Sequence, residues 1–415
     1  MRLRASSFAE VFTLAACLLA TAWVTHGKER EEVNITFNRN VAPILFKNCV
    51  QCHRPGEVAP MSLLTFKEAR PWARSIKEKV LTREMPPWHA DARFGQFAND
   101  RNLSQKEIDT IAAWVDGGAK EGDPAELPPA PRFVDGWNIG MPDAVFYIPQ
   151  EYRVPARGSV DYKYFAVPTN FSRDMWVQAA EIRPGARSVV HHILVWVRHG
   201  RNFTPLAGLP PGGRAEPVPK GLGIRIPAGS DLVFQVHYAP NGTPARDRSY
   251  IGLVFAKEPP RGEYVMMPIF NLWFTIPPRD PNFRVEASYT FTQDVLILAL
   301  WPHMHMRGKD FEFRVSNPNG TSTLLLSVPR FDFRWQTNYI LKEPVFVPKG
   351  SRIDCVAHFD NSVRNKFNPN PAKEVRWGDQ MWEEMMVGEV SYTPVNRSPK
   401  QQPQAPAGQT KHALT

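Results

Sequence analysis

The chain of 415 residues is long enough for about two or three domains, and its hydrophobic content of 43% is enough to give each of them a core. The 40 prolines favour loop-rich and β-rich architecture over helical bundles. The formal net charge of +9 comes from Lys and Arg residues scattered along the chain. A nucleic-acid binder has a dense basic run with interleaved aromatic residues, so no nucleic-acid partner is expected.

The first residues have the features of an export signal. Basic residues precede an apolar stretch from Val11 to Leu19, and Ala20-Thr21-Ala22 is a small-x-small cleavage site. The run that ends at Cys17 also resembles a lipoprotein box, and the apolar stretch is of borderline length for an uncleaved anchor. We therefore expect a signal peptide over residues 1–22 and a periplasmic or secreted protein, either free or held to a membrane through its N-terminal segment.

Residues 33–125 are expected to be mostly helical. Asn38–Cys49 and Thr65–Thr82 are candidate helices, and the clearest helix begins at Ser104, which forms a capping box ahead of an apolar face. Linker composition, rich in Pro, Ala and Glu, follows, and we assign residues 126–142 to the linker.

Cys49-Val50-Gln51-Cys52-His53 is a C-x-x-C-H sequence, the signature of c-type haem attachment. The two thiols bond to the haem vinyl groups, and the adjacent imidazole takes one axial position on iron. A redox C-x-x-C would need a βαβ setting, and a zinc half-site would need a second pair of ligands nearby; the sequence offers neither. We therefore expect one covalently bound haem c, held by Cys49, Cys52 and His53.

The second axial ligand of the haem is expected to be Met85, because it lies after the second helix on a stiff Pro-Pro turn. A thioether ligand would raise the potential of the iron. Met61 and His89 remain alternatives. With these residues the region resembles the small class I cytochrome c domains, in which a ligand Met follows the C-x-x-C-H motif at a distance. The resemblance implies a cytochrome c-like fold for residues 33–125.

Beyond the linker, short apolar and aromatic runs alternate with Pro, Gly and Asn turns. This spacing predicts two all-β domains of jelly-roll or sandwich type, over residues 143–258 and 263–395, with the break at Pro259–Gly262. The tail over 396–415 is polar and expected to be disordered. The predicted fold class is thus multidomain, with an N-terminal all-α cytochrome c-like domain followed by two all-β domains.

Five further histidines fall into three short motifs. His191 and His192 are adjacent, so a regular strand would point them to opposite faces, and both can reach one metal only if the chain bulges there. His303 and His305 are two apart, which places both rings on one face of a strand. His237 alone would more often be a core residue, but imidazoles are costly to bury without a partner, so the combination indicates metal binding.

These motifs carry a family resemblance. The chain is similar to the type II copper, ascorbate-dependent monooxygenases, which include the peptidylglycine α-hydroxylating enzymes and dopamine β-monooxygenase. The order of the motifs matches over roughly residues 143–395. The matching runs are His191-His192, Leu232–Tyr238, His303-Met304-His305 with Gly308, and Trp382-Glu383-Glu384-Met385.

The resemblance implies two copper ions. One site would store and supply an electron, and the other would bind and activate oxygen. The first would be formed by His191, His192 and His237, and the second by His303, His305 and Met385. Imidazoles suit both oxidation states of copper, and a thioether favours Cu(I). Met386 lies next to Met385 and stays an alternative for the thioether.

The activity implied is hydroxylation of a C–H bond of a small-molecule or peptide-like organic substrate with O₂. Electrons would pass through the haem from an ascorbate-like reductant or a redox protein. The alternative is a non-catalytic periplasmic protein that transfers electrons or carries copper, and the haem region could also serve only to dock a membrane donor.

The sequence departs from the peptide-amidating enzymes at two positions. Trp301 stands where they have the Arg that binds the substrate carboxylate, and Glu389 replaces a Tyr four residues after the ligand Met. Peptide amidation is therefore not expected. Cys355 lacks the partner that the animal enzymes have directly after the ligand Met, and we expect a buried, inert thiol. Asp360–Ser362 and Trp377–Gln380 are interpreted as turn residues, with orientation of the metal ligands as the alternative.

Overall fold

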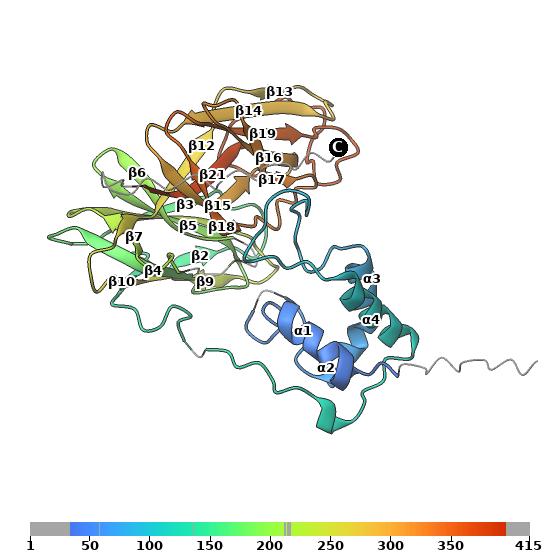
Figure 1. Cartoon of the computed structure of the whole chain (residues 1–415). Helices are drawn as coiled ribbons and strands as arrows, with labels where there is room; N and C mark the ends of the chain where they lie inside the picture. The colour runs from blue at the N-terminus through green and yellow to red at the C-terminus, as the bar shows by residue number, and fades with distance from the viewer. Residues whose placement is uncertain (1–33, 58, 135, 211–212, 214–216, 396–415) are drawn as a thin grey trace, which may run out of the picture.

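The computed structural model describes residues 34–395, apart from 58, 135, 211–212 and 214–216. The predicted signal peptide and the polar tail lie outside the described residues. Strands dominate the architecture: two β units are stacked on each other, and a smaller helical segment lies beside them (Figure 1). Within 34–395 no helix is both long enough and apolar enough to span a bilayer.

The first β unit has two larger sheets, with strand orders β1-β10-β4-β7-β11 and β3-β8-β5-β6, and a two-stranded sheet of β2 and β9. Side chains from both larger sheets, among them Val177, Ile193 and Phe234, share one buried cluster. The sheets therefore pack face to face across this core. The strands are β1 (Ala144–Tyr147), β2 (Tyr152–Val154), β3 (Lys163–Pro168), β4 (Met175–Arg183), β5 (Val190–His199), β6 (Asn202–Leu209), β7 (Leu222–Ile226), β8 (Asp231–Tyr238), β9 (Ala245–Asp247), β10 (Tyr250–Phe255) and β11 (Gly262–Glu263).

The second β unit repeats this plan. Its larger sheets have the orders β12-β21-β15-β18 and β14-β19-β16-β17, and β13 pairs with β20. Ile297, Phe313 and Val390 belong to the core between them. The strands are β12 (Val265–Phe270), β13 (Thr275–Ile276), β14 (Phe283–Thr290), β15 (Val295–His303), β16 (Gly308–Ser316), β17 (Ser322–Val328), β18 (Tyr339–Val347), β19 (Arg352–Phe359), β20 (Val375–Arg376) and β21 (Val387–Pro394).

The N-terminal segment, residues 34–126, contains short helices around a small core that includes Phe37, Leu45 and Trp114. The expected capping box at Ser104 is confirmed: its hydroxyl accepts from the backbone N–H of Glu107, and the Glu107 carboxylate accepts from the backbone N–H of Ser104. The helices are α1 (Ala42–Asn48), α2 (Phe66–Ala69), α3 (Ala73–Leu81) and α4 (Gln105–Asp116), with single turns of π-helix at Phe37–Val41 and of 3₁₀-helix at Arg70–Trp72 and Pro124–Glu126.

The predicted fold class is wrong in giving the chain an N-terminal all-α cytochrome c-like domain. The described chain is mainly β, and the helices of the N-terminal segment are few, short and separated by long irregular stretches. The stretch between α3 and α4 leaves the helices altogether (Figure 1). Trp88 and Phe97 pack on Tyr339 in the core of the second β unit, with ring centroids 4.9 and 5.4 Å away.

Backbone hydrogen bonds hold this stretch in place: Ala98 donates to the carbonyl of Ile340 at 2.8 Å, and Lys342 donates to that of Gln96 at 2.8 Å. Helical periodicity in a sequence identifies individual helices. It does not reveal which core an aperiodic stretch joins, and here that core is β. The chain thus has no separate all-α domain among its described residues. It has a small helical segment that is attached to a largely β protein.

Candidate metal sites

The imidazoles of His191, His192 and His237 converge in the first β unit, with ligand atoms within 4.8 Å of one another. The Nδ1 atom of His191 lies 3.1 Å from that of His192 and 3.2 Å from that of His237. The register of β5 against β8 shifts between Val190 and His192. This irregularity is the bulge that the adjacent pair requires, because it brings both rings to one place.

Burial keeps these three rings neutral. Desolvation lowers the pKa of His191 to about 4, with a smaller contribution from the positive charge of Arg187. It lowers the pKa of His237 to about 3 and that of His192 well below its usual value. A neutral imidazole has a free lone pair, so the cluster is ready to coordinate a cation without first losing protons. The ring of Tyr162 packs on His192 and His237, at centroid distances of 5.3 and 4.8 Å.

His303 and His305 form a second group at the end of β15, with ring centroids 5.2 Å apart. The Nδ1–H of His303 donates to Oε1 of Gln336 at 2.5 Å, and the Nδ1–H of His305 donates to the carbonyl of Glu383 at 3.3 Å. These contacts leave the Nε2 lone pair of each ring for a ligand. Burial lowers the pKa of both rings, that of His305 to about 3. Nε2 of His305 is buried without a hydrogen-bond partner among the described residues, which fits a metal ligand.

A buried carboxylate fixes the backbone around His305. Glu384 accepts from the N–H of His305 at 2.9 Å and from the N–H of Arg307 at 2.6 Å. The Arg307 guanidinium lies 3.9 Å from Glu384 and donates to Oδ1 of Asn361 at 2.9 Å. Glu384 and Asn361 are fully buried, and Arg307 is 1% exposed. The sequence predicts only a turn residue at Asn361, whereas in the structure its side chain also anchors that of Arg307.

The strand geometry separates the two candidate thioethers. His303 pairs with Val387 across β15 and β21, and Met385 comes two residues before Val387. Alternation of side chains along an extended chain would place Met385 on the face that carries His303. Met386 points the other way and is fully buried in the core of the second β unit. Met385 is half-buried. The fold favours Met385 as the thioether of this group.

The two histidine groups face each other across the seam between the β units. His192 and His303 line the same small cavity of about 10 Å³, together with Trp301 and Gln336. A cavity of this size is at the lower limit for a single water molecule. Trp301 reaches across the seam onto Gly208 of β6, where an added Cβ would lie 3.0 Å from Cη2 of the indole.

The C-x-x-C-H motif forms a tight turn directly after α1. The N–H groups of Cys52 and His53 both donate to the carbonyl of Cys49, at 3.1 and 3.0 Å. No disulfide forms among the described cysteines. The Nδ1 atom of His53 is buried without a hydrogen-bond partner in the described part of the chain. Thiols and an imidazole on one short turn, with an unsatisfied ring nitrogen, fit covalent haem attachment with His53 as axial ligand.

One arginine is near both the loop of this motif and the first histidine cluster. Arg187, four residues before His191, interacts electrostatically with Glu57 and Cys52 on one hand and with His191 on the other. Burial lowers the pKa of Arg187, and the negative partners raise it. This arginine therefore links the two candidate redox sites.

The three candidates for the second axial ligand lie in different surroundings. The backbone of Met61 contacts the His53 ring. His89 is half-buried beside the second β unit, near Asp332, Arg330 and Arg334. Met85 is half-buried at the end of the turn that follows α3, where its N–H donates to the carbonyl of Lys79 at 3.2 Å. Met85 stays the predicted ligand, with Met61 and His89 as the alternatives.

Sequence reasoning missed several residues that organise these sites. Gln336 and Tyr162 carry no motif of their own and contact the histidines only through the fold. Glu384 lies in the Trp382–Met385 run and Arg307 directly precedes Gly308, so a charged pair beside two candidate ligands was a usable signal in the sequence. Cys355 is fully buried as expected.

The chain matches no protein-family model and no curated protein. Similar solved structures include the major capsid protein P2 of bacteriophage PM2, at 8% identity over 61% of this chain and 98% of that chain, with a TM-score of 0.31. They also include allantoicase, at 10% identity over 51% and 79% of the two chains with a TM-score of 0.17, and the STIV MCP, at 11% over 52% and 96% with 0.21. Similarities this low carry no inference about function.

Proposed function

We propose that the protein is an exported, copper-dependent monooxygenase that hydroxylates a C–H bond of an organic substrate, with electrons delivered through a c-type haem attached at Cys49 and Cys52. The observation that carries the proposal is the meeting of two histidine groups across the seam, where His192 and His303 line one small cavity. One group has three imidazoles and the other has two imidazoles beside a thioether. Such unlike donor sets suit copper in different roles.

When bound, copper and haem supply one-electron redox steps and the reaction with dioxygen. The overall reaction consumes the substrate C–H bond, O₂, two electrons and two protons, and yields the C–OH product and water. The electrons come from an ascorbate-like reductant or a redox protein.

The chain's own residues prepare this chemistry. Oε1 of Gln336 holds the ring proton of His303 on Nδ1, and the carbonyl of Glu383 does the same for His305, so both Nε2 atoms point their lone pairs at the site. The Glu384 carboxylate accepts hydrogen bonds from the backbone N–H groups of His305 and Arg307, and so holds the segment of His305 next to that of Met385. Trp301 and Leu194 give the small cavity apolar walls beside the two histidines.

Arg187 supports the proposed route for electrons. Its positive charge acts on His191 of the first cluster and on Glu57, which comes shortly after the haem-attachment motif. Covalent attachment of a donor in the same chain raises its effective concentration at the acceptor. Electrons would therefore enter the copper sites through the three-histidine cluster.

Oxygen uptake tests the proposal. The copper-loaded, haem-containing protein is reduced by ascorbate with a panel of organic substrates, and dissolved oxygen and haem absorbance are followed together. We expect uptake that requires copper and re-oxidises the haem. Met385→Ala should abolish uptake and lower the copper content from two ions per chain to one. His199→Gln, at the exposed end of β5, is the control and should keep both.

The competing function is a non-catalytic electron-transfer or copper-carrying protein. Full occupancy by copper and haem with no oxygen uptake across the whole panel would overturn the monooxygenase proposal and favour this alternative. Uptake with haem that stays reduced through many turnovers would instead remove the haem from the electron route.

A further inference from the structure

A larger cavity lies next to the second histidine group. It has a volume of about 350 Å³ and lies between the two β units, with β4, β6 and β7 on one side and β15, β18 and β21 on the other. Trp301, Pro210 and Gln336 line both this cavity and the small one that His192 and His303 share. A molecule in the larger cavity would thus be separated from His303 only by these shared walls. Its size suits a small organic molecule.

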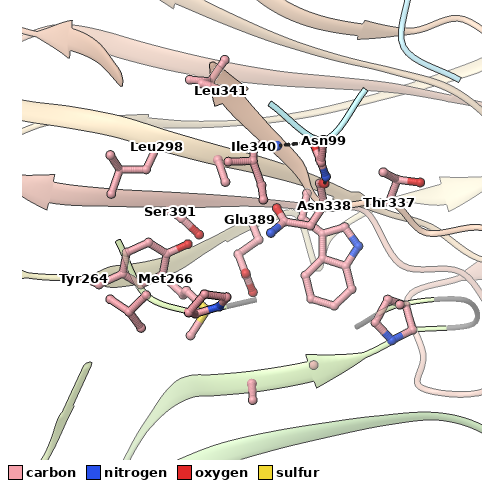
Figure 2. A pocket seen from close by; sticks show the side chains of 18 of the residues that line it. Asn99, Tyr264, Met266, Leu298, Thr337, Asn338, Ile340, Leu341, Glu389 and Ser391 are labelled. Carbon is pink, nitrogen blue, oxygen red and sulfur yellow. Dashed lines mark hydrogen bonds between the residues drawn. The ribbon is translucent and has the colours of Figure 1, made fainter. Parts of the chain in front are cut away.

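Glu389 is the carboxylate among the described residues that line this cavity. Figure 2 shows it extending from β21 toward the first β unit, near Met266 and Ser391. It pairs with Trp301 across β15 and β21, so it lies on the face of the sheet that carries the second histidine group. Among the hydrogen bonds and ion pairs of the described residues, none involves the Glu389 side chain.

The basic residues that line the cavity do not pair with Glu389. Arg101 and Lys342 line it, and Lys342 is exposed on β18. Burial raises the pKa of Glu389 to about 7, and no positive group is close enough to offset this effect. Glu389 is half-buried, and a carboxylate withdrawn from water without a nearby counter-charge is costly, so a cationic ligand would relieve this cost. The surrounding Trp301, Trp335 and Tyr264 offer aromatic and apolar surface to the rest of such a ligand.

We propose that the inter-unit cavity binds an organic substrate with a cationic nitrogen, and that Glu389 is the residue that selects it. The inference rests on the proposed function for what happens to the ligand, but its binding needs no turnover. The ammonium group would donate to the Glu389 carboxylate, and the hydrocarbon part would extend past Trp301 toward His303 and His305.

Binding of a matched set of probes tests this inference. Benzylamine, benzyl alcohol and benzoate have similar size and differ in charge. Their affinities for the full-length, copper-loaded protein are measured at pH 8, where Glu389 is ionised, by calorimetry and by quenching of tryptophan fluorescence. We expect benzylamine to bind about 10- to 100-fold more tightly than the other two, the range for one charge-assisted hydrogen bond.

Glu389→Gln should remove the preference for the amine, and Glu389→Asp should keep most of it. Glu343→Gln, an exposed carboxylate on β18, is the matched control and should bind as the unchanged protein does. Thermal unfolding of each variant shows that it is folded. Equal affinities for the three probes, a preference for benzoate, or an amine preference that survives in Glu389→Gln would each overturn the inference.

This outcome is separate from that of the oxygen test. Amine selectivity without oxygen uptake would leave Glu389 as the binding residue and remove the monooxygenase function. Oxygen uptake with neutral substrates and no amine selectivity would do the reverse.

Discussion

The two histidine groups are organised in different ways, although they lie opposite each other at one seam. In the first, a bulge in β5 alone brings His191 and His192 together beside His237, and the ring nitrogens contact one another. In the second, side chains and backbone carbonyls hold the rings apart: Gln336 orients His303, and Glu383 with Glu384 positions His305. Strand geometry thus builds the first site, and a hydrogen-bond network builds the second.

This comparison implies that the second site is the easier one to break by changing residues that touch no metal. The first cluster is tied to the pairing of β5 and β8, so its disruption requires a change in the sheet. The second depends on a few polar side chains, each of which can be replaced singly.

The largest effect is expected from Glu384→Ala. Its removal leaves Arg307 buried without its negative partner and frees the N–H groups of His305 and Arg307. Breaking a buried pair in this way costs about 3–5 kcal/mol of unfolding free energy. Denaturant unfolding measures this loss, and copper analysis should show one ion per chain, held by the first cluster. A variant with unchanged stability and both ions would contradict the network as the basis of the second site.

A smaller effect is expected from Gln336→Leu. The substitution keeps the size of the side chain but removes the acceptor of the His303 Nδ1–H, so the ring loses its fixed orientation. Loss of such an outer partner weakens metal affinity by about 10- to 100-fold. Competition titration with a copper chelator should show this weakening at the second site alone. Equal weakening at both sites would mean that the two groups are not organised independently.

The smallest effect is expected from Tyr164→Phe. The hydroxyl of Tyr164 in the first β unit donates to Oδ2 of Asp379 in the second at 3.0 Å and accepts from Nε2 of Gln235 at 2.7 Å. This bond spans the seam at an exposed position, so its loss should cost about 0.5–1.5 kcal/mol. Thermal unfolding should show this small shift with both copper sites retained. Loss of the second site in this variant would show that the site depends on docking of the two units more than on its own hydrogen bonds.

The sequence was sufficient to identify the histidine motifs and the need for a bulge at His191-His192, because period-two geometry makes adjacent ligands incompatible with a regular strand. It also favoured Met385 over Met386, and the alternation of buried and half-buried positions before β21 agrees. The fold class could not be derived in the same way. The capping box at Ser104 and the candidate helix from Thr65 agree with helices in the structure, but Trp88 and Phe97 belong to a β core hundreds of residues away in sequence. Contacts at such separation leave no local pattern, and neither does the approach of Gln336 to His303.

The attachment of the N-terminal segment has a mechanical consequence. The stretch with Trp88 and Phe97 fastens it to the second β unit, and the connection through residues 127–143 joins it to the first (Figure 1). A helical segment joined to two different β units at two points has little freedom to move relative to either of them. Cleavage of the chain within residues 127–143 would leave the helices attached only through the stretch with Trp88 and Phe97. They would stay joined to the second β unit but would lose their fixed position relative to Arg187 in the first. The two connections together therefore fix the orientation of the helices relative to both β units at once.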